Sequence, residues 1–196
     1  PRDIPFQFSI NQGYVLEFGD QYMRIKSNGA YVVEAAVGVA SINNIGLITI
    51  GGPHGYSVGD WIYNSESPGF SGLTWIVHSV PTAATLTVTD LFGNVVTSAT
   101  PSSYPTTPAT FARIYTVVSP YAAVDLPYLK YTQSADVMTL CCVNQSTSTE
   151  YPPYSLSRLG NTNWVFTQET FTASISAPTN VVAVGFSSST VNTQYS

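Results

Sequence analysis

The sequence predicts an all-β protein, and three observations carry that prediction. Helical periodicity is almost absent from the 196 residues, short alternating apolar and polar runs recur, and Gly, Asn and Asp separate these runs. Aromatic residues make up 13% of the chain and charged residues only 9%, against roughly 25% charged in average soluble domains. Many aromatics argue against disorder. They indicate a β-rich protein kept soluble by hydroxyls and amides, a surface typical of chains packed against other subunits.

The first block of the chain reads as a β-meander. Strands are expected at 5–10, 14–18, 22–26 and 30–35, separated by "NQG", "GD" and "SNG". The last two separators are tight-turn signals that join antiparallel neighbours. We therefore expect a β-rich platform domain over 1–36, which resumes at 113–176.

The middle block reads as an inserted domain over 37–112. Strands are expected at 46–50, 60–64, 73–80, 85–90 and 111–118. Short strands at such regular spacing suit a small barrel or sandwich. The Pro/Ser/Thr-rich segment "TPSSYPTTP" at 100–108 has no periodicity and is expected to be a surface loop.

The third block returns to the platform. Strands at 129–134, 137–143, 154–160 and 163–168 predict a meander, or one propeller-like blade. The remaining residues, 177–196, hold a linker-like "SAPTN" and one strand signal. Because a lone strand cannot bury its own face, we expect the start of a further β-domain there, in a chain that is part of a longer protein.

The charge pattern limits the partners. Net charge is −5, and the cations Arg2, Arg24, Lys26, Arg113, Lys130 and Arg158 are scattered. Tight binding to nucleic acid needs a basic stripe, whereas an acidic, polar wall that DNA slides past is compatible with this pattern. No apolar run approaches the roughly 18 residues of a membrane span, and no charged-then-apolar leader opens the chain. We therefore expect no transmembrane segment and no signal peptide.

Candidate nucleophiles and metal ligands are weakly supported. His54 lies in the turn-like "GGPHGYSVGD" and His78 in a strand, without further ligands at metal spacing. The stretch "GFSGL" at 69–73 breaks the G-x-S-x-G spacing of a serine elbow, and no phosphate-cradling glycine loop occurs. Cys141 and Cys142 are neighbours, for which a mutual disulfide would be strained. We expect two reduced thiols in a strand, one of them buried.

Carboxylates are the other candidates for chemistry. A glycosidase pair could come from Asp125, Asp136, Glu150 and Glu169. Asp60, Asp90 and Asp136 each lie at one end of a strand signal, however, where an Asx-type turn needs their side-chain oxygens. We therefore expect a non-enzymatic protein without cofactor or metal. Its abundant Tyr, Phe and Trp would form core, a subunit interface or a glycan platform.

Three stretches together resemble a known family. They are "IPFQFSINQGYVLEFGDQYMRI" (4–25), "HGYSVGDWIY" with "DLFGNVV" (54–63 and 90–96), and "RIYTVVSPYAAVDLPYLKYTQSADVMTL" with "YPPYSLSRLGNTNW" (within 113–164). In this order they resemble the tail-nozzle, or tail tubular protein B-like, virion subunits of short-tailed phages. The middle block resembles the small FCCH-like β-barrel inserted in many of them, and "SAPTNVVAV" is similar to the start of an Ig-like module.

The chain departs from the family at one place. Relatives run on from "QSADVM" to a His-Pro segment, which "CCVNQSTSTEYPP" replaces here, and Asn161 stands where a His is usual. A role for those histidines is therefore in doubt. The retained pattern residues are expected to be fold determinants: Tyr131, Gln133, Ser134, Asp136, Pro152, Pro153, Arg158, Gly160 and Trp164.

The resemblance implies a function in the virion tail. Such subunits form a ring, expected to be a hexamer, below the portal and adaptor proteins and next to tail fibres or a needle. DNA passes through without specific binding. Two other classes stay open: a glycan-binding module or adhesin that uses Trp61 or Trp75, and a tail-associated glycan hydrolase that depends on Asp136.

Overall fold

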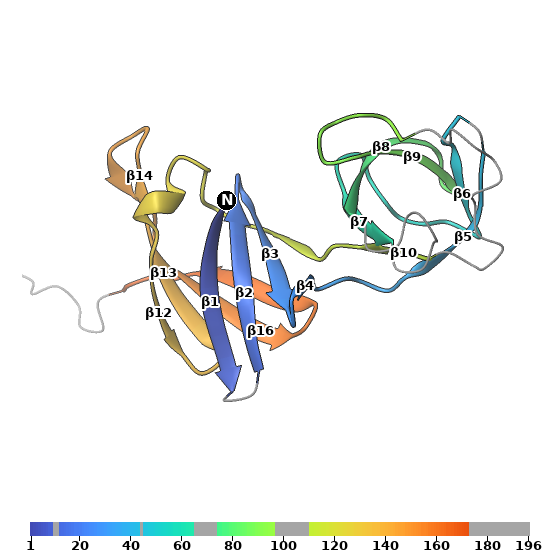
Figure 1. Ribbon diagram of the computed structural model, residues 1–196. Coiled ribbons are helices and arrows are strands. Elements are labelled where there is room, and N and C mark those ends of the chain that lie inside the picture. The colour runs from blue at the N-terminus through green and yellow to red at the C-terminus, as the bar shows by residue number, and fades with distance from the viewer. Residues whose placement is uncertain (10–11, 44, 65–73, 97–109, 173–196) are drawn as a thin grey trace, which may run out of the picture.

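The computed structural model describes residues 1–9, 12–43, 45–64, 74–96 and 110–172. Within these ranges the chain is built of antiparallel strands, with a short 3-10 helix, η2, at Leu126–Tyr128. The all-β prediction is therefore confirmed, and Figure 1 shows two separate β-assemblies. The stretch 69–73, which breaks the serine-elbow spacing, lies outside the described residues, as do the segments expected to form a surface loop (100–108) and a further domain (177–196).

The first sheet combines strands that precede the barrel in the chain with one strand that follows it. Its strands run in the order β1-β2-β3-β11, with β4 paired to β3. Their bounds are β1 Arg2–Ser9, β2 Gln12–Gly19, β3 Tyr22–Ser27, β4 Ala30–Tyr31 and β11 Thr116–Val118. The predicted tight turn at "SNG" is confirmed, since Asn28 and Gly29 have φ of 52° and 80°. These positive values let two residues connect β3 to β4.

The middle of the chain forms a closed barrel. Its strands pair in the order β10-β5-β6-β9-β8-β7, and β10 pairs with both β5 and β7. Their bounds are β5 Val37–Ile42, β6 Ile48–Ile50, β7 Trp61–Asn64, β8 Thr74–Thr82, β9 Thr85–Thr89 and β10 Thr110–Arg113. Its interior is apolar, with Trp75, Leu86 and Phe111 among the buried residues.

The structure corrects four strand predictions. The strand expected at 137–143 ends at Cys141, and Val143–Asn144 forms a separate short strand. Strand β5 was missed, because its Gly, Ala and Ser weaken the strand signal. The strand expected at 30–35 ends at Tyr31, because the chain then crosses to the barrel. The strand expected at 111–118 is two strands, β10 in the barrel and β11 in the first sheet, with Ile114 between them bridged to Val33.

A second sheet follows the predicted meander. Its order is β12-β13-β16-β17, with bounds Lys130–Ser134, Val137–Cys141, Tyr154–Gly160 and Asn163–Gln168. The predicted turn between β12 and β13 is confirmed at Ala135 and Asp136. A small hairpin of β14 (Val143–Asn144) and β15 (Thr149–Glu150) lies between β13 and β16.

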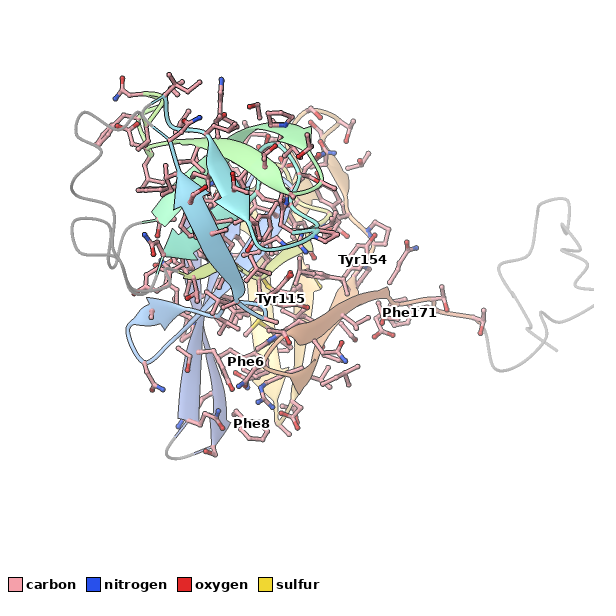
Figure 2. The ribbon with its side chains drawn as sticks, turned by 90° about the vertical axis from the view of Figure 1, so that its right-hand side faces the viewer. Phe6, Phe8, Tyr115, Tyr154 and Phe171 are labelled. Carbon is pink, nitrogen blue, oxygen red and sulfur yellow. The ribbon has the colours of Figure 1, made fainter. Side chains whose placement is uncertain are left out.

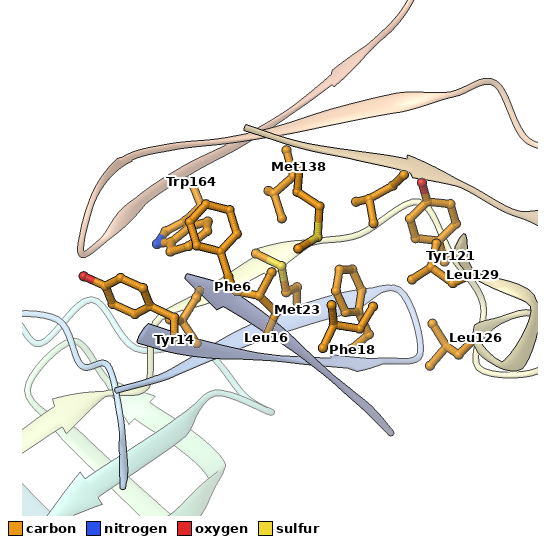
Figure 3. Packing of buried hydrophobic residues seen from close by; sticks show 14 of the residues in the cluster. Phe6, Tyr14, Leu16, Phe18, Met23, Tyr121, Leu126, Leu129, Met138 and Trp164 are labelled. Atoms are coloured by element: carbon orange, nitrogen blue, oxygen red, sulfur yellow. The ribbon is translucent and has the colours of Figure 1, made fainter. Parts of the chain in front are cut away.

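The two sheets pack face to face around one core, which makes this part of the protein a sandwich (Figure 3). The first sheet contributes Phe6, Leu16, Phe18 and Met23, and the second contributes Met138, Leu140, Leu156 and Trp164. The meander is thus half of a two-layer unit. At the periphery lie Phe8, near the tip of the β1–β2 hairpin, and Phe171, beyond β17 (Figure 2); they are 38% and 83% exposed.

Candidate functional site

The family-pattern tryptophan is a core residue that joins the two sheets. Trp164 is 3% exposed, and its ring meets those of Phe6 and Tyr14 edge-on at centroid distances of 4.8 and 5.6 Å (Figure 3). Its Nε1 donates a hydrogen bond to the Asn161 carbonyl, 3.1 Å away. A buried indole that makes edge-on ring contacts and also donates its N–H to a hydrogen-bond acceptor fixes the packing of its neighbours strongly.

Arg158 and Gln133 connect the second sheet to the first by polar contacts. The Arg158 Nη2 donates to the Tyr14 hydroxyl at 2.9 Å, and its guanidinium lies over the Phe8 ring at 4.1 Å. The Gln133 amide exchanges two hydrogen bonds with the backbone of Gln7, 3.1 Å from its N–H and 2.9 Å from its carbonyl. Both side chains therefore hold the β1–β2 hairpin against the second sheet.

The other pattern residues lie at turns and on the surface. Tyr131 is 42% exposed, and Ser134 is also exposed at the end of β12. Gly160 follows the register shift between β16 and β17. The Pro153 carbonyl accepts a hydrogen bond from the Glu169 N–H, and Pro152 is exposed. The structure therefore does not gather the pattern residues into one cleft.

The side chains considered for catalysis serve local structure. His54 Nδ1 accepts a hydrogen bond from the Tyr56 N–H at 3.0 Å, while His78 is exposed on β8. Asp90 Oδ1 accepts from the Phe92 N–H at 2.9 Å, which confirms the predicted Asx turn at that position. For Asp136 no such turn is seen, and its Oδ1 is buried without a hydrogen-bond partner among the described residues.

The carboxylates considered as a glycosidase pair have separate partners. Asp125 is 1% exposed, and it accepts hydrogen bonds from the Gln145 N–H at 2.8 Å and the Tyr151 hydroxyl at 2.7 Å. Glu169 accepts from the Ser155 hydroxyl, and Glu150 is exposed. Asp125 thus anchors the β14–β15 hairpin.

The thiols are free and one is buried, as expected, but only Cys141 lies in a strand: it ends β13, whereas Cys142 lies between β13 and β14. Cys141 is exposed and Cys142 is buried. Burial raises the pKa of the Cys142 thiol, as does the negative charge of Asp125. In the part of the chain that the structure describes, no three His, Cys, Asp or Glu side chains gather as metal ligands.

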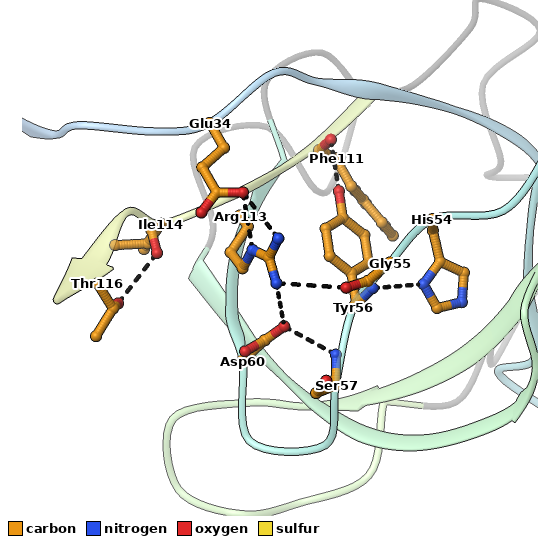
Figure 4. A network of polar contacts seen from close by, with 10 residues as sticks. All are labelled: Glu34, His54, Gly55, Tyr56, Ser57, Asp60, Phe111, Arg113, Ile114 and Thr116. Carbon is orange, nitrogen blue, oxygen red and sulfur yellow. Dashed lines mark hydrogen bonds and ion pairs between the residues drawn. The ribbon is translucent and has the colours of Figure 1, made fainter. Parts of the chain in front are cut away.

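Sequence reasoning missed a charged cluster where the barrel joins the sandwich. We call Arg24, Glu34, Asp60, Trp61 and Arg113 the junction cluster (Figure 4 shows its Arg113 part). Arg113 ends β10, and its carbonyl accepts a hydrogen bond from the Glu34 N–H at 2.8 Å. The segments that enter and leave the barrel therefore run side by side. Oppositely charged side chains on them can meet.

Arg113 makes the central contacts of this cluster. Its Nε donates to Glu34 Oε2 at 2.9 Å, and its Nη1 donates to Asp60 Oδ2 at 3.1 Å (Figure 4). Burial tends to lower the pKa of Arg113, but the hydrogen bond and charge of Glu34 outweigh that effect and raise it. The guanidinium therefore stays charged and ties the entering segment, β10 and the loop before β7 together.

Arg24 makes the second link between barrel and sandwich. It projects from β3 and lies over the Trp61 ring of β7, with its guanidinium carbon 3.6 Å from the ring centroid. Arg24 is 6% exposed, and burial lowers its pKa against the attraction of Glu17, 3.9 Å away. The cluster lines a polar cavity of about 180 Å³. Its two cations and two carboxylates balance, so it suits a structural joint better than a charged ligand.

The outer face of the first sheet continues this charge network. Glu17 Oε2 accepts from the Tyr31 hydroxyl at 2.8 Å and pairs with Lys26 Nζ at 2.5 Å. Burial works to raise the pKa of Glu17, but the hydrogen bonds from Lys26 and Tyr31 prevail and leave it below its ordinary value. Burial and the same carboxylate raise the pKa of Tyr31 to about 12.

The outer face of the second sheet is of the opposite kind. Pairing places outward-facing residues of its four strands in two rows, Thr132–Thr139–Ser155–Thr167 and Ser134–Val137–Ser157–Val165. We call these eight residues the hydroxyl face. None of the eight is charged, and all are at least partly exposed. Such a surface can be covered without desolvating an ion.

The tryptophans that a glycan platform would need are not free. Trp75 is 4% exposed inside the barrel, where its ring meets Phe111 at 5.9 Å. The Trp61 ring is covered by the Arg24 guanidinium. The buried Trp75 ring therefore offers no open face on which a sugar could stack, and Arg24 occupies one face of the partly exposed Trp61 ring.

Comparisons with known proteins add no relative. A scan of family models, a search of curated proteins and a search of solved structures found no match to this chain. Among the described residues, no helix has the length and apolarity to cross a membrane.

Proposed function

We propose that this protein is a non-enzymatic structural subunit of a short-tailed phage virion that assembles with copies of itself into a tail-nozzle ring. The ring, a hexamer in this proposal, sits below the portal and adaptor proteins, contacts tail fibres or a needle, and guides DNA during ejection. The sequence resemblance at 4–25 and within 113–164 motivates this assignment, together with the barrel inserted into a β-platform.

The hydroxyl face is the observation that carries the proposal. An exposed sheet face without charge is inexpensive to desolvate, because hydroxyls and short apolar groups lose little hydration compared with ions. The chain as a whole carries −5, so copies repel one another wherever carboxylates meet. The eight residues of the hydroxyl face add no charge of their own to such a contact, and the charges next to them are Glu169, which accepts a hydrogen bond from Ser155, and Lys130 in the neighbouring row.

The cations support passage of DNA without binding. Arg2 donates to the carbonyls of Leu126 and Leu129, and Lys26 pairs with Glu17. The guanidiniums of Arg24, Arg113 and Arg158 are stacked or hydrogen-bonded within the chain as well. Five of the six cations are engaged in this way and are poorly placed to release counterions from DNA phosphates, which is the main source of non-specific affinity. Lys130 is the exception, since it is exposed and has no ion pair among the described residues.

Electron microscopy and mass photometry of the full-length protein test this proposal. Closed rings of one size are the expected result, and they should show no affinity for duplex DNA at physiological salt. A strictly monomeric full-length protein at every soluble concentration would contradict the proposal. Turnover of host polysaccharide that is lost in Asp136→Asn would instead support the hydrolase alternative.

A further inference from the structure

The second sheet ends in two strands whose outer edges are open. Strands β12 and β17 lie at the ends of the order β12-β13-β16-β17, so among the described residues each pairs with a strand on one side only. In an antiparallel pair, alternate residues direct their backbone N–H and C=O groups toward the partner strand, and the residues between direct theirs away from it. The register therefore shows which backbone groups face outward on each edge.

On β17 the outward backbone groups belong to Phe166 and Gln168. The Glu169 N–H donates to the Pro153 carbonyl, so Glu169 bonds inward, as does every second residue before it along β16. Phe166 and Gln168 lie between these residues, and their backbone groups have no hydrogen-bond partner among the described residues.

On β12 the outward backbone groups belong to Tyr131 and Gln133. The Arg158 N–H donates to the Asp136 carbonyl, so the even-numbered residues of β13 bond to β16 and the odd-numbered ones bond to β12. Their partners on β12 are its even-numbered residues. Tyr131 and Gln133 lie between these, and in the described part of the chain their backbone groups have no hydrogen-bond partner either.

The edges of β12 and β17 are less protected than the edge of β1. Natural edges are protected against another strand by proline, bulges, charge or a covering side chain. The β1 edge has two of these devices, since Pro5 has no N–H and the Gln133 side chain bonds the backbone of Gln7. The outward residues of β12 and β17 include no proline, and Lys130 is the one charged residue in either strand. Such edges are templates for pairing with another chain.

The two edges fit each other. Strands β12 and β17 run in opposite directions within the sheet, so β17 of one copy can lie antiparallel to β12 of the next while both sheets face the same way. One register brings the outward residues of both strands into hydrogen-bonded pairs, Tyr131 with Gln168 and Gln133 with Phe166. Each such pair exchanges two backbone hydrogen bonds.

The same register continues the hydroxyl face from one copy to the next. Thr167, at the β17 end of the first row, meets Thr132 of the neighbouring copy, where that row begins again. In the second row Val165 meets Ser134 in the same way. A slip by one residue would instead turn the hydroxyl face of one copy toward the core side of the next.

Opposite charges also meet in this register. Lys130 and Glu169 lie at the two ends of one cross-strand row, so Glu169 of one copy lies opposite Lys130 of the next. Neither has an ion pair among the described residues; Glu169 accepts a hydrogen bond from Ser155, and Glu150, outside this row, lines a pocket beside Lys130. An exposed pair contributes little energy, so it selects the register, and the backbone bonds supply the affinity.

We propose that the β17 edge of one copy pairs with the β12 edge of a second copy, through Phe166 and Gln168 on one side and Gln133 and Tyr131 on the other. Because the two edges are different surfaces, the contact is head-to-tail, and its repetition closes a ring or extends a filament. The inference rests on the self-assembly of the proposed function, for which it supplies one interface. Contacts made by the hydroxyl face are additional to it.

Proline at an outward position tests the pairing, because it blocks an edge without breaking the sheet behind it. Gln168→Pro and Tyr131→Pro, one at each edge, should each weaken self-association of the full-length protein roughly tenfold or more, since backbone bonds are lost and their partners are left unpaired. Val118→Pro is the matched control, because its N–H points outward at the β11 edge of the first sheet, and association should be unchanged. Circular dichroism verifies that each variant is folded.

Mixing the two proline variants identifies the edges as partners. Gln168→Pro retains the β12 edge and Tyr131→Pro retains the β17 edge, so an equimolar mixture should form a heterodimer that grows no further in analytical ultracentrifugation. A mixture without heterodimer, or rings that persist undiminished in Gln168→Pro, overturns the edge pairing and leaves the proposed function standing. Another segment of the chain on the β17 edge would give the latter result. A wild-type protein that remains monomeric contradicts both.

Exchange of the two charges tests the register without proline. Lys130→Glu and Glu169→Lys should each weaken association about twofold to fivefold, because each places like charges opposite one another. The double variant restores opposite charges at every contact and should recover wild-type association. A double variant that associates no better than the single ones overturns the register and with it the inference.

Discussion

The two sheets of the sandwich share one core but have opposite outer faces. The outer face of the first sheet carries Asp3, Glu17 and Arg24 in one cross-strand row, with Lys26 beside them. Glu17 and Arg24 are 7% and 6% exposed, because neighbouring side chains and the barrel's Trp61 cover them. The hydroxyl face of the second sheet carries no charge among its eight residues and lies open.

This difference teaches where a chain with few charges places them. Charges are concentrated where partners within the same molecule neutralise them, at the joint between barrel and sandwich. Exposed charges remain elsewhere, as at Lys130 and Glu150, but none falls among the eight residues of the hydroxyl face. Ion pairs at the joint help to fix its geometry, with the buried Nε and Nη1 of Arg24 left without a hydrogen-bond partner among the described residues. An uncharged face can be covered by another chain without desolvating an ion. The proposed ring would use the two faces in these two ways.

The largest expected effect comes from disrupting the hydrophobic core that the two sheets share. Trp164→Ala removes the indole that packs on Phe6 and Tyr14. We expect the free energy of unfolding to fall by about 3–5 kcal/mol, the usual cost of truncating a large core aromatic. Urea unfolding followed by circular dichroism measures it. Trp164→Phe should recover part of the loss, and an unchanged midpoint for Trp164→Ala would show that the sheets do not depend on this contact.

Disrupting the junction cluster should lower the free energy of unfolding by a smaller amount. Arg113→Met leaves Glu34 and Asp60 without their shared cation. We expect a loss of about 2 kcal/mol, below that of a fully buried pair because Arg113 is partly exposed. Differential scanning calorimetry should then show the barrel and the sandwich unfolding less cooperatively. Arg113→Lys keeps the charge but cannot form the planar fork, so its free energy of unfolding should lie between those of the wild type and Arg113→Met.

Removing one charge from the first outer face should change the pH dependence. The pKa of Glu17 is depressed in the folded protein, so its stabilisation is present above the ordinary value of 4.5 and is lost as pH falls through the folded pKa. Glu17→Gln should therefore cost about 1 kcal/mol at neutral pH and nearly nothing in strong acid. Unfolding measured from neutral pH down to about pH 3 should show the curves converging. Parallel curves would contradict the assigned role of Glu17.

Adding one charge to the second outer face should barely affect folding but should prevent assembly. Thr139→Glu places a carboxylate in the middle of the hydroxyl face. We expect the free energy of unfolding to change by about 0.5 kcal/mol or less, as for most surface substitutions. Mass photometry should show loss of rings. The control is Val118→Glu on the first sheet, where Val118 is 82% exposed; rings that form equally in both variants would exclude the hydroxyl face as an interface.

Much of the fold could be predicted from local patterns. The strands around 14–18, 22–26, 129–134 and 163–168 and the turns at Asn28 and Ala135 follow from alternation and turn residues within a few positions. The Asx turn at Asp90 is equally local. The errors at β5 and at 111–118 have the same origin, since β5 has a weak local signal and one continuous strand signal at 111–118 serves two different sheets.

The sequence by itself therefore determined the all-β class, most strands and the low charge of the surface, because these depend on neighbours along the chain. Only the tertiary structure decided that the sheets form a sandwich, that Arg113 meets Glu34 across 79 positions, and that Trp61 is covered by Arg24. It alone aligned eight uncharged residues from four strands into one face. Such contacts depend on strand register and on which face each strand buries, and neither is encoded in a short window of residues.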